Sequence, residues 1–453
     1  MFNTLFLPEI REMLASEDRA GLQEVCTAIH PAATAEFMQG LTASEAWQVL
    51  QFTDEHTRIE VFLYLEPDRQ VQILEAEDRQ GVANLIDRMA PDDRVDLLED
   101  VEKGVVDEIL KLLPADARRD ILRLSAHPEN TAGAVMTTAV AKLPEDISVR
   151  NALEALQAQS DDVETIYYLY IVDESDHLRG LVSTRELISN LKKPDALLSD
   201  IMETELITVD VDDDQEIVAQ KVAKYDLLAI PVVDDQHRML GIITYDDVID
   251  VVLEEAIEDA HRIAGVDPLE ESYLRTSLWT LSWKRGIWLA VLFLFALVTA
   301  FALREYDRQL DKWRWLVFFI PLIISSGGNS GSQSATLIIT ALVRGDIKLS
   351  DWWVVVQREV LSGLILGGFL ALLGLLAAIF LGVPSADGHA AIYVLPITVV
   401  LVVICGTFFG SILPLTFQRL GLDPALMSNP FVAGLIDIVG IVIYLNVAMR
   451  LLE

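Results

Sequence analysis

The sequence predicts a multidomain membrane protein in which a long, acidic, water-soluble part precedes a bundle of membrane-spanning helices. The 453-residue chain is 52% hydrophobic and has a mean hydropathy of +0.36, which is too apolar for an ordinary soluble protein. Charge gathers in residues 1–270, which hold 58 of the 69 acidic and 22 of the 34 basic residues. Residues 271–453 instead contain five long apolar stretches, each able to cross a hydrocarbon layer about 30 Å thick as a helix.

Composition also limits the partners and the compartment. The first part carries a net charge of −36, which repels nucleic acid and anionic lipid and attracts cations. The two cysteines, Cys26 and Cys405, indicate neither a disulfide nor a thiolate metal site. Because the first residues lack a basic segment followed by a long apolar core, we predict no signal peptide. We therefore expect cytoplasmic N-terminal domains and a multi-pass domain in the cell (inner) membrane.

Residues 1–128 are predicted to form an α-solenoid, a superhelix of short stacked helices. Units of about a dozen residues each open with a capping or helix-breaking residue and continue with apolar residues at helical spacing. Pro31, Pro67, Pro91 and Pro114 suit first helical turns, where the missing N–H is not needed. The segment holds no catalytic constellation, which favours an interaction or sensing module over an enzyme.

Residues 129–252 contain a duplication with a spacing of 61 residues. The recurring residues are Val172, Asp173, Gly180, Ser183 and Glu186, which correspond to Val233, Asp234, Gly241, Thr244 and Asp247. Apolar β-rich runs alternate with helical stretches, so each copy is predicted to fold as a βαββα-like unit. This α/β duplication resembles a tandem pair of CBS domains.

The CBS resemblance implies a regulatory module, and many such pairs bind adenosine nucleotides between the repeats. Glu186 would then lie near a ribose and Arg185 near phosphates, with Ser183 in the same turn, so these three residues are candidates for binding ATP. A purely structural dimerisation module is the alternative.

A dense acidic run connects the repeats to the membrane part. Asp247, Asp250, Glu254 and Glu258 fall on one helical stripe, Glu255 and Asp259 lie on the next, and no Lys or Arg lies between Tyr245 and His261. Each like-charge pair at this spacing costs a helix roughly 0.2–0.5 kcal/mol. A solvated charged face is one interpretation. Since Val248, Val251, Val252 and Ile257 call for a packed helix, we favour divalent-cation binding, with residues 253–275 as a connecting, plug-like helix.

The five predicted spans belong to a domain over residues 276–453. They cover residues 286–303, 315–343, 360–383, 390–418 and 424–449. The only Asp, Glu, Lys or Arg inside them is Asp437, near the middle of the last span. A charge at that depth costs about 2.5–3.5 kcal/mol unless it faces water or a cation. A protonated or hydrogen-bonded aspartate that locks helices together is one interpretation, and a cation site in a pore is the other.

A polar insert, GGNSGSQS, interrupts the second predicted span. Small residues allow close helix contact, and polar groups at this depth persist only when buried or facing a water-filled cavity. This insert, the segment DPALMSNPFVAGLIDIVG and the order of domains resemble the MgtE family of magnesium channels or transporters over essentially the whole chain. The resemblance implies a homodimer in the lipid bilayer, with a Mg²⁺ pore lined by the second and fifth spans and closed by intracellular Mg²⁺.

The resemblance also assigns roles to individual residues. Asp437 matches the central pore aspartate, and Asn329 and Asn429 match polar positions near the pore. The implied regulatory Mg²⁺ ligands are Glu60, Asp92, Asp226, Asp247, Asp250, Glu255, Glu258, Asp259 and Asp423. The insert reads GGNSGSQ where GGNTGNQ is commoner in the family, which is a mild departure.

Magnesium chemistry agrees with this set of residues. Mg²⁺ sheds water reluctantly and is usually held by one or two carboxylates with waters retained, and the sequence offers no His/Cys cluster for zinc or copper. The alternatives are a proton- or sodium-coupled carrier and a membrane-anchored, nucleotide-sensing regulator. The spans contain no HExxH or GxSxG motif, so we do not expect an enzyme.

Overall fold

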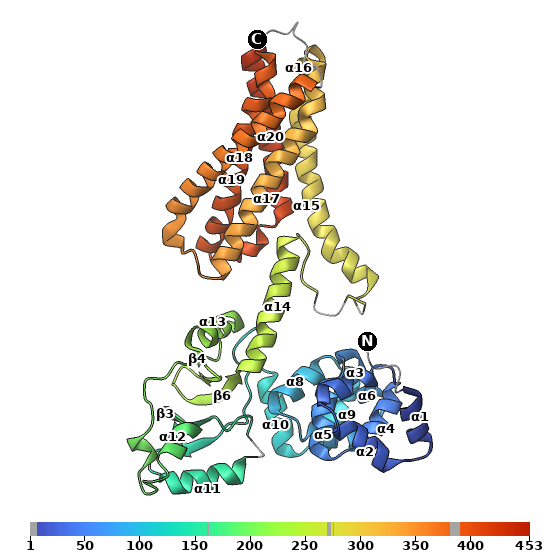
Figure 1. Ribbon diagram of the computed structural model, residues 1–453, viewed down its shortest axis with the longest axis vertical. Helices are drawn as coiled ribbons and strands as arrows, with labels where there is room; N and C mark the ends of the chain where they lie inside the picture. The colour runs from blue at the N-terminus through green and yellow to red at the C-terminus, as the bar shows by residue number, and fades with distance from the viewer. Residues whose placement is uncertain (1–6, 161–162, 270–272, 275, 381–389) are drawn as a thin grey trace. The chain divides into compact units, whose positions relative to one another are not determined.

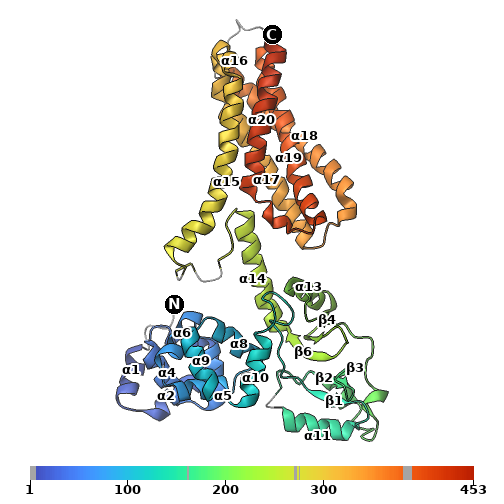
Figure 2. The same ribbon diagram turned by 180° about the vertical axis from the view of Figure 1, so that it is seen from behind.

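The computed structural model describes residues 7–160, 163–269, 273–274, 276–380 and 390–453. The chain divides into two compact units, Met1–Val252 and Leu253–Glu453. One hydrophobic core joins the N-terminal helices to the second repeat of the first unit, and a separate core lies in the second unit. Figures 1 and 2 show the elements of each unit.

The first unit begins with the predicted superhelix of short helices. These are α1 Leu7–Ala15, α2 Arg19–Thr27, α3 Pro31–Met38, α4 Ala43–Gln51, α5 Glu55–Leu63, α6 Pro67–Ala76, α7 Arg79–Ile86, α8 Pro91–Glu99, α9 Lys103–Leu112 and α10 Ala115–Leu124. Each of α3, α4, α7 and α8 packs on the second helix after it, which builds a continuous stack. Prolines occupy the first turn of α3, α6 and α8 as predicted, whereas Pro114 is the N-cap of α10.

The two repeats follow with the same βαββα order, as predicted. The first contains β1 Lys142–Pro144, α11 Val149–Gln159, β2 Tyr168–Val172, β3 Leu178–Ser183 and α12 Thr184–Ser189. The second contains β4 Val209–Asp210, α13 Gln215–Tyr225, β5 Ala229–Val233, β6 Met239–Thr244 and α14 Tyr245–Ile263. In each sheet the first strand pairs parallel to the second, and the third pairs antiparallel to it.

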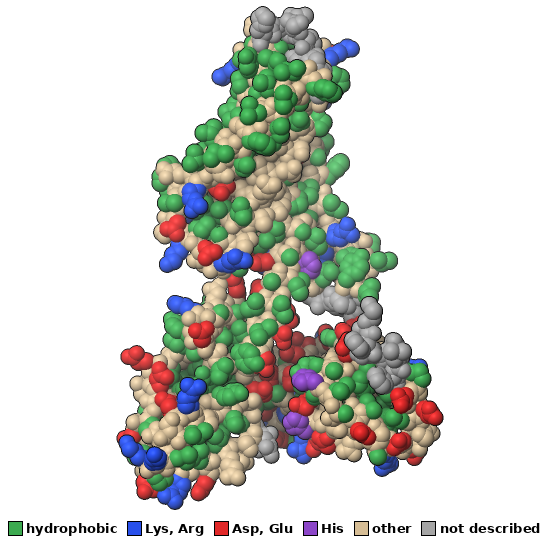
Figure 3. Space-filling view, in the orientation of Figure 1, with side chains coloured by type: hydrophobic (Ala, Val, Ile, Leu, Met, Phe, Trp, Pro, Cys, Tyr) green, Lys and Arg blue, Asp and Glu red, His purple; other side chains and the backbone are tan. Residues whose placement is uncertain are grey.

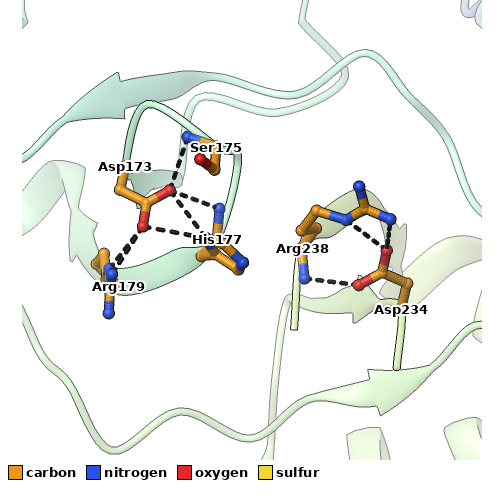
Figure 4. Close-up of polar contacts among 6 residues, drawn as sticks. All are labelled: Asp173, Ser175, His177, Arg179, Asp234 and Arg238. Atoms are coloured by element: carbon orange, nitrogen blue, oxygen red, sulfur yellow. Dashed lines mark hydrogen bonds and ion pairs between the residues drawn. The ribbon is translucent and has the colours of Figure 1, made fainter. Parts of the chain in front are cut away.

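The duplication extends to the turns between the paired strands. Asp173 and Asp234 each accept backbone N–H groups from their own turn and ion-pair with an arginine, Arg179 and Arg238 respectively (Figure 4). The two turns also bind each other, since Leu178 donates its N–H to His237 and Met239 donates to Asp176. A pseudo-twofold relation between the repeats therefore persists in their hydrogen bonds.

The acidic helix α14 begins earlier than the predicted connecting segment 253–275. It starts directly after β6 and ends at Ile263, so it is both the last helix of the second repeat and the start of the connection. Val248 and Val251 are buried as expected, whereas Val252 and Ile257 are about half exposed in the single chain. Residues 270–272 and 275 of the predicted segment lie outside the described residues.

The second unit consists of long helices joined by short turns. They are α15 Leu278–Glu305, α16 Asp307–Lys312, α17 Ile320–Val343, α18 Trp352–Phe380, α19 Ala391–Arg419 and α20 Asn429–Leu452, with 3₁₀ turns at Arg314–Phe319, Leu349–Asp351 and Pro424–Leu426. Hydrophobic side chains cover most of these helices and charged ones gather toward the ends (Figure 3). Four segments of the described chain are long and apolar enough to cross a membrane, namely Leu278–Glu305, Leu349–Phe380, Ala391–Arg419 and Asn429–Leu452.

The helix with the polar insert, α17, is not among these four, so the five-span count remains a prediction. It is nevertheless a continuous 24-residue helix through the insert. The end of the predicted third span, residues 381–383, lies outside the described residues.

Glycines let α17 pack closely on α19 and α20. A Cβ added at Gly406 would lie 2.6 Å from the carbonyl oxygen of Gly327, and one added at Gly331 would lie 3.0 Å from Val432. A Cβ at Gly406 would clash with the Gly327 carbonyl, and one at Gly331 would be crowded by Val432. These positions therefore require glycine or a shift of the helices. Figures 1 and 2 show the three helices side by side in both views.

Candidate cation-binding sites

Asp437 lies on α20, against the polar insert of α17. A Cβ added at Gly328 would lie 3.5 Å from the Asp437 carboxylate and 3.3 Å from Ala433, so the glycine leaves room for the acid. Ile436 beside it is fully buried, whereas Asp437 is only partly buried. Within the described part of the chain, no side chain donates a hydrogen bond to this carboxylate. That absence weighs against an aspartate that locks helices together and leaves the carboxylate available to a cation.

The two predicted pore asparagines behave differently. The Asn429 carbonyl accepts from the Ser332 hydroxyl (3.0 Å), and its amide oxygen accepts from Thr336 (3.1 Å), so it joins α17 to α20. It also lies eight residues, about 12 Å along a helix, from Asp437. Asn329 immediately follows Gly328, is exposed and donates to Ser325 (3.2 Å). Asn429 therefore serves to join the helices, and a role for Asn329 beside Asp437 stays a prediction.

A second carboxylate enters the interior of this unit. The Ser334 hydroxyl lies 2.5 Å from Glu359 of α18 and 3.0 Å from the Thr407 carbonyl oxygen of α19. Sequence reasoning missed it because the third span was predicted to begin at residue 360, whereas α18 begins at Trp352. The position of Glu359 at the start of a long apolar run, directly after Arg358, was the available signal.

Acidic residues of α14 and the loop before α20 come together in the second unit. Arg262 ion-pairs with Glu258 of its own helix and with Asp423 (2.5 Å). Burial raises the pKa of Asp259 to about 6, and repulsion from Asp423 and Glu255 adds to the effect. The predicted ligands therefore form one cluster, which consists of Glu255, Glu258, Asp259 and Asp423. Arg262 neutralises part of its negative charge.

A larger acidic cluster lies within the first unit. Its residues are Asp92, Asp93 and Asp96 of α8, Glu164 before β2, and Asp246 and Asp247 of α14. Figure 3 shows acidic side chains gathered between the helical domain and the repeats. The structure thus brings together two predicted ligands, Asp92 and Asp247, and adds four that were missed. The spacing of the three α8 acids along one helix was the overlooked signal.

Burial and mutual repulsion raise the pKa values of carboxyl groups in this cluster. The pKa of Asp93 rises to about 7 through burial and the charges of Asp92, Asp247 and Asp246. The pKa of Asp247 rises to about 6 for the same reasons, although Thr244 hydrogen-bonds to its carboxylate. Asp92 is 8% exposed, and its Oδ1 has no hydrogen-bond partner. Asp96 and Glu164 keep contact with solvent, so a hydrated cation has access.

No three His, Cys, Asp or Glu side chains of the described residues are close enough to chelate one ion directly.

Three predicted ligands lie outside both clusters. Glu60 contacts His56 of its own helix (3.3 Å), with both side chains largely exposed. Asp226 is the exposed C-cap of α13, with a φ of +52°. Asp250 is exposed on α14. A cation-binding role for these three residues stays a prediction.

The predicted nucleotide site borders a cavity of about 120 Å³ between the repeats. Its lining residues are Tyr168, Leu181, Glu203, Glu205, Leu206, Ile207, Leu227, Ala229 and Pro231. Ser183 pairs with Tyr168 across the sheet, which places the predicted turn beside this cavity. Glu186 accepts the N–H (3.0 Å) and hydroxyl (3.1 Å) of Ser183, and Arg185 is exposed.

The acidic cluster of the first unit predicts a pH dependence. Folding raises the pKa values of Asp93 and Asp247, so their protonated forms favour the folded state, and this contribution is lost as pH rises through about 6 to 7. Without divalent cations, we expect a higher thermal midpoint for this unit at about pH 5 than at about pH 8. Millimolar Mg²⁺ should raise the midpoint at the higher pH and change it little at the lower.

The matched variants for this experiment are Asp93→Asn and Asp107→Asn, since Asp107 is exposed on α9. Asp93→Asn should reduce the dependence of the thermal midpoint on pH and on Mg²⁺, and Asp107→Asn should keep both dependences. A midpoint that falls on acidification would contradict the assignment.

Comparison with known proteins extends these observations. The family model described as a divalent cation transporter, MgtE, matches residues 320–447, the MgtE intracellular N domain matches 29–130, and the CBS domain matches 132–193 and 198–254. The magnesium transporter MgtE of Thermus thermophilus is 36% identical over 448 residues, which cover 98% of each chain. A crystal structure of the soluble part of a magnesium transporter is 34% identical, with a TM-score of 0.52, and covers 55% of this chain and 97% of that one. The cytosolic domain of the Mg²⁺ channel MgtE in complex with ATP is 32% identical, with a TM-score of 0.50, and covers 53% of this chain and 98% of that one.

Proposed function

The chain belongs to the MgtE family of divalent cation transporters, and from this premise we propose that it is a Mg²⁺-selective channel that mediates magnesium uptake. The family predicted from the sequence motifs is confirmed. The protein is a membrane transporter with apolar C-terminal helices and a soluble, cytosolic N-terminal part that contains a helical domain and a CBS pair. The relatives that match it over most of their length are named as magnesium transporters.

The observation that carries this proposal is the Asp437 carboxylate beside Gly328. A carboxylate at this depth in the membrane, with no hydrogen-bond donor among the described side chains, needs water or a cation. Asn329 continues the polar surface of α17 at the same level. A hydrated Mg²⁺ held through its waters by such groups keeps the mobility that conduction requires.

Exposed side chains in the single chain support a homodimer. Ser332 and Asn429 bind each other, but Asn329 and Gln333 are exposed on an apolar domain, where lipid would leave their amide groups without full hydrogen bonding. A second copy facing this surface would give them a water-filled pore and place two Asp437 side chains across it. On α14, Ile249, Val252, Leu253 and Ile257 form an exposed apolar stripe that a second copy would also cover.

We assign gating to the two acidic clusters. Intracellular Mg²⁺ would bridge their carboxylates, relieve the repulsion that raises their pKa values, and favour the compact, closed state. An importer closed by its own product provides homeostasis.

A flux assay tests the proposed function. The purified chain in liposomes, with a Mg²⁺ gradient as the only ion gradient, should conduct Mg²⁺ and respond to membrane potential by about 2.3 kcal/mol per charge per 100 mV. Flux that requires a proton or sodium gradient would identify a coupled carrier instead. No flux under either condition would leave only a membrane-anchored regulator.

We also propose that ATP binds between the repeats, and the cytosolic domain of a related Mg²⁺ channel in complex with ATP supports this. Calorimetry should show ATP binding that strengthens when Mg²⁺ is present, because the domain is otherwise too acidic for a polyphosphate. Arg185→Ala should weaken binding about tenfold, since an exposed guanidinium is free to pair with phosphate. Arg150→Ala, on the exposed side of α11, is the control, and equal affinity in the two variants would remove Arg185 from the site.

A further inference from the structure

A second cavity in the first unit is lined by three positively charged side chains and one acidic side chain. It has a volume of about 230 Å³, and its lining residues are Arg123, Lys142, Asp176, Arg238, Met239 and Leu240. It shares no lining residue with the nucleotide cavity between the repeats. It also contains none of the acidic residues assigned to cation binding.

Three separate elements bring the cations together. Arg123 is in the last turn of α10, Lys142 begins β1, and Arg238 directly precedes β6. The Lys142 ammonium donates to the Met239 carbonyl (2.9 Å), which holds it at the cavity wall. Burial lowers the pKa of Lys142, and the charge of Arg123 lowers it further, while Asp176 opposes both effects. Arg123 and Lys142 therefore repel each other across the cavity.

The charges around the cavity are not balanced. Arg238 is already paired with Asp234 (2.7 Å; Figure 4). Asp176 partly offsets Lys142. The Arg123 side chain forms no hydrogen bond or ion pair with any residue that the structure describes. Its place in the last turn of α10 complements the helix dipole, but that does not explain why a half-buried lysine lies beside it. An excess of positive charge is unexpected in a part of the chain with a net charge of −36.

We propose that this cavity binds a phosphate group, either as inorganic phosphate or as the end of a small phosphorylated solute. The planar donors of Arg123 suit a tetrahedral oxyanion, and the Lys142 ammonium has protons left after its bond to Met239. The phosphate neutralises the repulsion between these two cations. Because α10 belongs to the helical domain and β1 to the first repeat, the bound anion ties the two domains of the first unit together.

Calorimetric titration of the purified full chain in detergent tests the proposal. The probes are inorganic phosphate and glycerol phosphate, at constant ionic strength and without ATP or divalent cations, so that no metal–phosphate complex forms at the acidic clusters. We expect saturable binding that weakens about tenfold in Arg123→Gln and is lost in Arg123→Gln/Lys142→Gln. Phosphate should also raise the thermal midpoint of the wild type, but not that of the double variant.

The matched control is Arg119→Gln, which makes the same charge change at an exposed position of the same helix. It should bind phosphate like the wild type. Binding of inorganic phosphate identifies the free anion as sufficient, and binding of glycerol phosphate alone identifies an esterified ligand. The proposal is overturned if neither probe binds saturably, or if Arg123→Gln and Arg119→Gln bind equally. Because Arg123 is exposed, its variant should fold, and an unchanged midpoint without phosphate verifies this.

Discussion

Replacing Asp437 by Ala is expected to abolish most of the Mg²⁺ flux while leaving the folded protein intact. The carboxylate is the one charge in the middle of α20, it faces Gly328 of α17, and no described side chain hydrogen-bonds to it. Removing the carboxylate that pairs with a bound Mg²⁺ costs several kcal/mol of binding free energy. The occupancy of the pore by Mg²⁺ should therefore fall at least about tenfold. Stability should stay the same or rise slightly, because a costly charge leaves the interior.

The measurement is Mg²⁺ flux in liposomes, with assembly followed by size-exclusion chromatography. Asp437→Asn separates charge from shape, and it should be nearly as inactive as Asp437→Ala. Asp311→Asn is the control, because Asp311 is exposed on α16 and its contact with Arg314 is long, at 3.9 Å. Wild-type flux through Asp437→Ala would show that the carboxylate is structural.

The order of the domains was predictable because local features of the sequence identify each domain. First-turn prolines and capping residues mark the short helices, and the 61-residue repeat marks the two βαββα units. The acidic run was predicted to be helical over 246–259, and α14 continues directly from β6 through this run, so the domain boundary placed at residue 253 falls inside one helix. The exposed state of Val252 and Ile257 was also not predictable, since apolar spacing does not say whether the covering surface belongs to the same chain.

Site residues were predictable only in part because they depend on tertiary contacts. Asp92 and Asp247 lie 155 residues apart in the sequence and still share one cluster, whereas Glu60 contacts only His56. Asp93 escaped notice because the spacing of the three α8 acids was overlooked, and Glu164 because nothing local distinguishes it from other surface acids. Glu359 escaped because the predicted span began one residue later than the charge, whereas α18 continues seven residues further toward the N-terminus.

Neutralising five acids of α14 should leave the pore open at high intracellular Mg²⁺. The residues are changed to Asn or Gln together: Asp247, Asp250, Glu255, Glu258 and Asp259. The change removes the repulsion between the acids as well as the ion sites. Whether the pore of the variant is open or closed therefore discriminates between two mechanisms. If repulsion alone opens the pore, the variant is closed even without Mg²⁺. If bridging ions are needed for closure, it stays open.

The second outcome is expected, because only coordination imposes a specific geometry on the helix. Moving a two-state equilibrium from 1:99 to 99:1 requires about 5.5 kcal/mol of differential binding. Several weak sites, each adding about 1 kcal/mol near physiological Mg²⁺, would supply it and make the response steep. Arg262 already pairs with Glu258 and Asp423, so Mg²⁺ adds to a cluster that is only partly neutralised.

The measurement is flux as a function of Mg²⁺ on the cytosolic side, and the half-inhibitory concentration should rise at least about tenfold in the variant. A control with the same change in net charge neutralises five exposed acids of the repeats outside both clusters: Glu145, Asp146, Glu174, Asp212 and Asp235. If inhibition depends on specific bridging, this control keeps the wild-type Mg²⁺ response, because its acids do not converge. Equal loss of inhibition in both variants would instead mean that total charge controls the pore, and a closed five-site variant would make repulsion the force that opens it.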